Sequence, residues 1–140
     1  MTQPASRPPN LLRIANAVLA GVRTWRVILV LLIVCIAVLA LMPSPPPDLD
    51  TGWDKLNHLL AFTSLAFAAS LSSPASHSAR AWLLIALLGF GGLIEVFQLF
   101  VPGRSTEWAD LLADAIGIAC GAVIASVMLW LVSAQAMRRH

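Results

Sequence analysis

Three ionisable side chains, His58, Glu95 and Asp114, stand within otherwise apolar stretches of the sequence. A helical rise of ~1.5 Å per residue places each of them roughly 7–9 Å inward from the same end of a predicted helix bundle. A histidine beside carboxylates can act as a general base, with one carboxylate orienting the imidazole ring. The same groups can also hydrogen-bond to a polar ligand. We therefore predict these three as candidate catalytic residues.

Further polar residues lie beside these three at helical spacing. Within each predicted helix they are three or four positions apart, so that each helix carries one polar stripe. Arg104 precedes a helix start, where free N–H groups and the helix dipole favour an anion. The predicted ligand-binding residues are Lys55, His58, Glu95, Gln98, Arg104, Asp110 and Asp114.

Each of these residues also has a purely structural interpretation. For His58, Glu95 and Asp114 it is hydrogen bonding that joins neighbouring helices. For Arg104 it is a solvated charge paired with a nearby acid, and for Lys55 a side chain that reaches the membrane interface. One histidine with two or three carboxylates could hold a divalent metal that activates water. No two histidines stand at i and i+4, however, so we predict no metal ligands and no cofactor.

The elements that position these residues follow from the composition. Of 140 residues, 59% are hydrophobic and 11% charged, and the mean hydropathy is +0.82. Soluble domains carry roughly 25% charged residues. The chain is too apolar for disorder or nucleic-acid binding, and two cysteines are too few for a disulfide scaffold. The composition therefore predicts an integral membrane protein.

Four apolar stretches predict an all-α fold with four transmembrane helices. They are Val27–Met42, Leu56–Leu71, Ala81–Val101 and Trp108–Val132. A span needs roughly 20 residues, so the first two stretches require their flanking turns or a thinner bilayer. A buried hairpin is the alternative for the second stretch. The domains expected are a tail with an interfacial helix over residues 1–26, the membrane domain over 27–132 and a basic tail over 133–140.

The charges predict the orientation of these spans. Four spans place both termini on one side, which then holds seven of the nine basic residues and no acid. Because basic residues favour the cytoplasmic side, both termini are expected there. The five tryptophans fall at span ends, as indole rings do.

The segment Leu11–Thr24 has one apolar and one basic face, which predicts a helix lying on the inner membrane surface. An extension of the first span is the alternative. The prolines of Pro43–Pro47 end that span. No small-x-small cleavage site follows it, so we expect it to stay in the mature protein.

Four motifs together resemble the VanZ-like family of small bacterial membrane proteins. The resemblance covers about residues 50–125, and the family pattern often has Asn at the position of Asp114. The motifs are Asp54-Lys55-x-x-His58, Glu95-x-x-Gln98, Pro102-Gly103-Arg104 and Asp110-x-x-x-Asp114-x-x-Gly117-x-x-x-Gly121. The resemblance implies a multi-pass protein of the bacterial inner membrane, in a family named after a protein linked to low-level teicoplanin resistance.

Two functions are predicted for such a protein. The first is a cell-envelope role, in which an outward-facing polar pocket binds an anionic or polar group. Its partners would be membrane lipids, a lipid-linked envelope precursor or a lipoglycopeptide, and no nucleic acid. The second is an intramembrane enzyme that uses the His/carboxylate cluster on a lipid or cell-wall precursor. A proton-coupled transporter fits less well, because the inner halves of the spans are apolar.

Small residues recur at every fourth position of the last stretch, which is typical of close helix packing. They are Ala113, Gly117, Gly121 and Ala125. The pattern leaves the partner open. It can be the segment 89–92 of the third span, or a second subunit in a homo-oligomer formed through Gly117 and Gly121.

Overall fold

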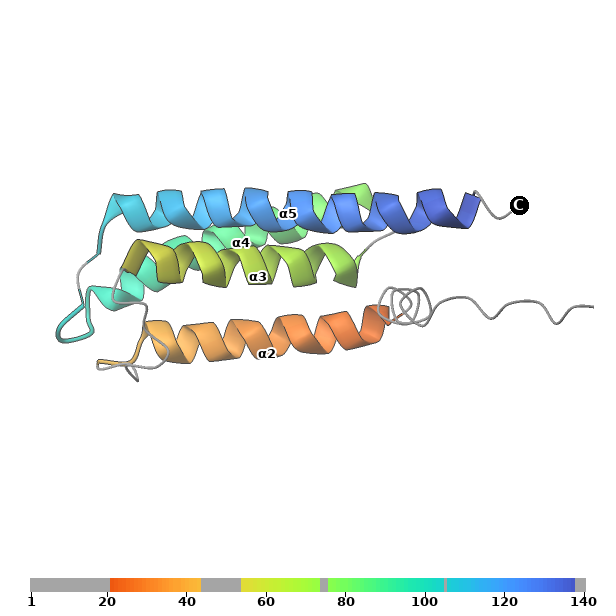
Figure 1. Ribbon diagram of the computed structural model, residues 1–140. Helices are drawn as coiled ribbons and strands as arrows, with labels where there is room; N and C mark the ends of the chain where they lie inside the picture. The colour runs from red at the N-terminus through yellow and green to blue at the C-terminus, as the bar shows by residue number, and fades with distance from the viewer. Residues whose placement is uncertain (1–20, 44–53, 74–75, 105, 138–140) are drawn as a thin grey trace, which may run out of the picture.

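The computed structural model describes residues 21–43, 54–73, 76–104 and 106–137. Within these ranges the chain forms α-helices and no β-strand, which confirms the all-α class. Successive helices run in opposite directions, so the start of the first and the end of the last lie at the same end of the bundle (Figure 1). The helices are α2 (Val22–Ala40), α3 (Asp54–Ser72), α4 (His77–Gln98) and α5 (Trp108–Met137).

Three of these helices are long and apolar enough to cross a membrane. They are α2, α4 and the Trp108–Ala134 part of α5. Their outer faces expose large apolar side chains, such as Leu31, Leu93 and Val123, which suit contact with lipid. α3 has the same length as α2, 19 residues, but is less apolar, because its first turns carry the polar residues.

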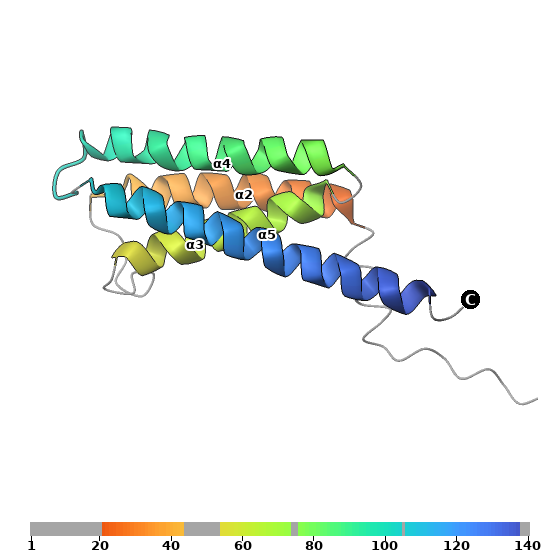
Figure 2. The ribbon, with the colours of Figure 1, turned by 90° about the horizontal axis from the view of Figure 1, so that it is seen from above.

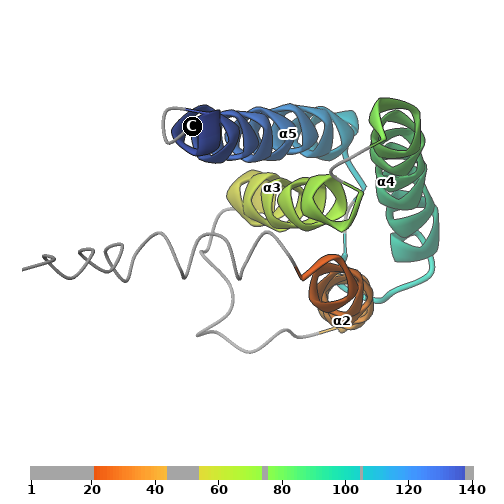
Figure 3. The same ribbon diagram turned by 90° about the vertical axis from the view of Figure 1, so that its right-hand side faces the viewer.

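α3 is the central helix of the bundle. It contacts the other three and packs most extensively against α5 (Figure 3). Nine of its residues are buried, whereas α2 buries only Leu29 among its described residues. Since α3 packs against protein over most of its surface, polar side chains on its buried faces need not face hydrocarbon. This position explains why its sequence is the least apolar of the four.

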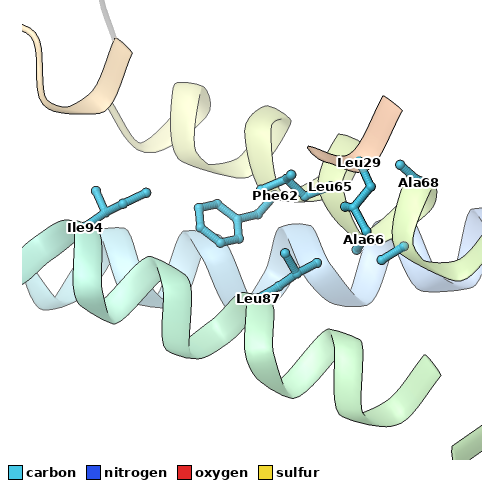
Figure 4. Packing of buried hydrophobic residues seen from close by; sticks show 8 residues of the cluster. Leu29, Phe62, Leu65, Ala66, Ala68, Leu87 and Ile94 are labelled. Carbon is cyan, nitrogen blue, oxygen red and sulfur yellow. The ribbon is translucent and has the colours of Figure 1, made fainter. Parts of the chain in front are cut away.

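The apolar core lies where α3 meets its neighbours. Phe62 and Leu65 of α3 are almost wholly buried. Leu29 of α2 and Leu87 and Ile94 of α4 pack around them (Figure 4). The core therefore joins three helices below the polar residues and holds α3 in register with α4.

Gly117 and Gly121 allow α5 to lie directly on α3. A Cβ atom on Gly117 would come within 2.6 Å of the carbonyl oxygen of Leu59, and one on Gly121 would collide with that of Thr63. The partner of this glycine face is thus α3 of the same chain. Among the described residues the segment 89–92 is therefore not the partner of these two glycines, and formation of a homo-oligomer stays a prediction.

The helix ends differ in part from the predicted ones. α2 begins at Val22, five residues before the predicted start, so the end of the predicted surface helix is its first turn. α4 begins at His77, where the Ser76 hydroxyl accepts a hydrogen bond from the Ala79 N–H at 3.1 Å. α5 continues past the other helices (Figure 2). The predictions for residues 11–20, for most of the proline run and for the last three residues lie outside the described residues.

Candidate functional site

The predicted site residues gather at one end of the bundle. The first turns of α3 and α5 meet the last turns of α2 and α4 there, beside the α4–α5 loop (Figure 1). We call this group of charged and polar residues the polar end. It consists of Asp54, Lys55, His58, Glu95, Gln98, Arg104, Glu107, Asp110 and Asp114.

A hydrogen bond between two buried side chains forms the centre of the polar end. His58 Nδ1 lies 2.8 Å from Asp114 Oδ1, and the Asp114 side chain is 0% exposed. An ionised carboxylate only accepts, so the Nδ1–H group donates. The bond fixes the plane of the imidazole ring and leaves Nε2 free of this contact.

Glu95 approaches the other side of the same ring. Its Oε1 atom lies 3.9 Å from His58 Nε2. Among the described residues, both Glu95 carboxylate oxygens and Oδ2 of Asp114 are buried without a hydrogen-bond partner of good geometry, although the Glu107 backbone N–H group lies near Glu95. Buried polar atoms are nearly always paired, because an unpaired one costs free energy. The centre therefore has acceptor atoms that a proton, a cation or a hydrogen-bond donor would satisfy.

Gly91 of α4 makes room for the Asp114 carboxylate. A Cβ atom at Gly91 would collide with Asp114 Oδ2 and lie 3.1 Å from Phe62 Cζ. By contrast, a Cβ at Gly89 or Gly92 would meet nothing within 4 Å. The sequence predicts only a packing role for the segment 89–92, because three glycines in four residues do not show which one faces the site.

Exposed ion pairs form the outer layer of the polar end. Lys55 Nζ lies 2.7 Å from Glu107 Oε2 and 3.9 Å from Asp110 Oδ1. The ammonium group is thus already paired with acids. The sequence does not predict the pairing of Lys55 with Glu107, because it does not show that the start of α5 lies beside Lys55.

Arg104 and Gln98 bind the C-terminal end of α2. The Arg104 guanidinium donates to the carbonyl oxygens of Leu39 and Met42 at 3.0 and 3.4 Å. Gln98 Nε2 donates to the Ala40 carbonyl oxygen at 3.0 Å. The last carbonyl groups of a helix lack partners within it, so these contacts complete its hydrogen bonding. A direct role of either residue in ligand binding stays a prediction.

Three possible metal ligands converge at the polar end. One atom each of Asp54, His58 and Asp110 lies within 4.8 Å of the other two. Two of these residues are four positions apart on α3, and the third comes from α5. The sequence spacing indicated no such set, because α5 contributes its ligand from more than fifty residues away.

The fold and the polar end together define a class of protein. It is a helical membrane protein in which a central, polar-tipped helix presents a histidine between carboxylates from two neighbours. A family model described as VanZ/LLP1 matches residues 32–130. The chain belongs to this family, which confirms the resemblance seen in the motifs. No curated protein and no solved structure matches the chain.

Proposed function

We propose that this VanZ-family protein spans the bacterial inner membrane four times and that its polar end, at the outer face, binds the polar group of a membrane amphiphile. The amphiphile would be a lipid, a lipid-linked cell-wall precursor or a teicoplanin-type lipoglycopeptide. Binding would place the head of such a molecule beside His58 and leave its chains in the surrounding lipid.

The distribution of charge supports this orientation. Arg23, Arg26 and Arg80 lie at the end of the bundle opposite to the polar end. All acidic residues of the described part lie at the polar end. Basic residues favour the cytoplasmic side, so the polar end faces outward and both termini lie in the cytoplasm. α3 then crosses the membrane as the helix that the other three shield from lipid.

One observation carries the proposed ligand chemistry. Among the described residues, neither oxygen of the Glu95 carboxylate has a hydrogen-bond partner of good geometry, although the backbone N–H group of Glu107 lies near this carboxylate. The carboxylate also lies beside a histidine whose other nitrogen is already engaged. The two nearby cations are occupied, Lys55 by Glu107 and Arg104 by α2. The atoms left without a partner are thus hydrogen-bond acceptors, which need a ligand that donates hydrogen bonds. A hydroxyl, amide or ammonium group fits it better than the anion that the sequence also suggested.

A comparison of two lipid headgroups tests this chemistry. Phosphatidylethanolamine has N–H donors, whereas phosphatidylcholine has the same charge pattern and none. We expect native mass spectrometry to show that the protein retains phosphatidylethanolamine in preference to phosphatidylcholine. In Glu95→Gln the affinity for phosphatidylethanolamine should be at least about tenfold weaker, which corresponds to a loss of about 1.4 kcal/mol of binding free energy. Glu107→Gln removes an exposed carboxylate at the same end and serves as the matched control. Equal retention of both lipids, or no effect of Glu95→Gln, would refute the proposal.

The geometry also favours one second function, an intramembrane hydrolase or transferase. The Asp114–His58 hydrogen bond of 2.8 Å orients the ring so that Nε2 can accept a proton from a nucleophile. The measurement is turnover of a lipid-linked cell-wall precursor by purified protein. His58→Gln would abolish turnover of a general-base enzyme, while a binding protein shows no turnover in either form.

A further inference from the structure

The tertiary structure brings together one imidazole and two carboxylates that no single segment contains. Asp54 and His58 come from the first turns of α3, and Asp110 comes from the first turn of α5. Their ligand atoms lie within 4.8 Å of one another. Metal–ligand bonds of roughly 2.0–2.2 Å require shorter separations, so the side chains must move inward when a metal binds. The Asp54 side chain is 45% exposed and is free to rotate toward the other two.

Asp110 supplies a second, independent observation. Its side chain is only 2% exposed, yet no hydrogen-bond partner for its buried Oδ1 atom is found in the part of the chain that the structure describes. The nearest described cation is Lys55 Nζ at 3.9 Å, and that ammonium group is bound to Glu107 at 2.7 Å. Burying an ionised carboxylate is costly without a close counter-charge. The free oxygen therefore points to a cation that binds closer than Lys55.

His58 has the hydrogen bonding of a metal ligand. Its Nδ1 atom is held by Asp114, which leaves Nε2 as the nitrogen for a metal. Histidines that bind metals commonly donate their other N–H group to a carboxylate in this manner. Glu95, 3.9 Å from Nε2, adds negative charge beside that nitrogen.

We infer that Asp54, His58 and Asp110 form a binding site for a divalent transition metal of the Zn²⁺ type, with Asp114 orienting the histidine. Zn²⁺ binds both imidazole nitrogen and carboxylate oxygen, and a site with three protein ligands keeps a fourth position open. The polar end holds five carboxylates and two basic side chains, so its net charge favours a dication. This inference goes beyond amphiphile binding and does not rest on it.

Two basic side chains, Arg104 and Lys55, lie near the carboxylates of the proposed metal site. Arg104 Nη1 lies 3.8 Å from Asp54 Oδ1, and Lys55 Nζ lies 3.9 Å from Asp110 Oδ1. Both distances exceed a hydrogen bond. Each cation also has a closer partner, in the α2 carbonyl groups and in Glu107. The metal can therefore take the carboxylate oxygens without leaving either cation unpaired.

The experiment uses the full chain without a histidine tag, purified in detergent, stripped with a chelator and titrated with Zn²⁺ alone. We expect about one Zn²⁺ per chain and an affinity at least about tenfold weaker in Asp110→Asn and Asp54→Asn. Asp54 is half exposed, so its variant folds even if the buried change does not. Asp114→Asn, which alters only the orienting carboxylate, should weaken binding about 10–100-fold.

His77→Ala is the matched control, because His77 is an exposed imidazole at the start of α4, remote from the polar end. It should bind Zn²⁺ like the unaltered protein. No stoichiometric Zn²⁺, or an unchanged affinity in both Asp54→Asn and Asp110→Asn, would overturn the metal site. Phosphatidylethanolamine retention, measured on the same stripped samples, reports on the proposed function separately. A loss of Zn²⁺ binding with lipid retention intact therefore bears on the metal site alone.

Discussion

Replacing Gly91 by alanine tests whether the fold of α4 holds the central hydrogen bond in place. The added Cβ would occupy the position of Asp114 Oδ2 and lie 3.1 Å from Phe62 Cζ. Phe62 is buried in the core and resists movement. The Asp114 carboxylate must therefore turn away, and its 2.8 Å bond to His58 lengthens or breaks.

The size of the effect follows from the bond that is lost. A hydrogen bond to a charged group contributes about 1.5–3 kcal/mol, and both partners here are buried. We expect Gly91→Ala to lower the free energy of unfolding by about 2 kcal/mol. The neighbouring Gly92→Ala adds the same methyl group to the same helix but meets nothing within 4 Å. It should leave stability unchanged or raise it slightly, because alanine favours helix.

The assay is reversible unfolding in mixed detergent micelles, followed by circular dichroism. A double-mutant cycle with Asp114→Asn adds a second test. If Gly91→Ala acts through Asp114, its cost in the Asp114→Asn protein should fall well below its cost alone. Equal stability of Gly91→Ala and Gly92→Ala would refute the reasoning. So would fully additive costs in the cycle, since the damage would then lie elsewhere.

Three further predictions concern packing, the end of α2 and orientation. Gly121→Ala should destabilise the protein by about 1–3 kcal/mol, because its Cβ would meet the α3 backbone; Gly89→Ala, with free space, should not, and equal unfolding curves would contradict this. Arg104→Ala should free the last turn of α2, seen as faster hydrogen exchange there than in the unaltered protein; unchanged exchange would show that Arg104 does not hold this end. In a cysteine-free background, an impermeant thiol reagent added to intact cells should label Glu107→Cys and not Ser78→Cys, and the reverse pattern would invert the proposed topology.

The sequence predicts which residues gather at the candidate site, but not which of them contact one another. Depth along a helix depends on local spacing alone, so His58, Glu95 and Asp114 could be assigned to one level. The partners of Arg104 could not, because its contacts are the α2 carbonyl groups some sixty residues away. Likewise, the spacing of Gly117 and Gly121 predicts close packing, but only the assembled bundle shows that α3 is the helix they meet.

By itself the sequence determined that this protein lies in a lipid membrane, that it is all-helical, and at which end of the bundle its acidic residues lie. Hydropathy, periodicity and charge are properties of segments, and each segment carries them whatever its neighbours are. The tertiary structure alone decided that α3 is central, that Gly91 leaves space for Asp114, and that Asp54, His58 and Asp110 converge. Those are relations between helices, set by which surfaces fit together, and a chemical site built from three helices exists only once they pack.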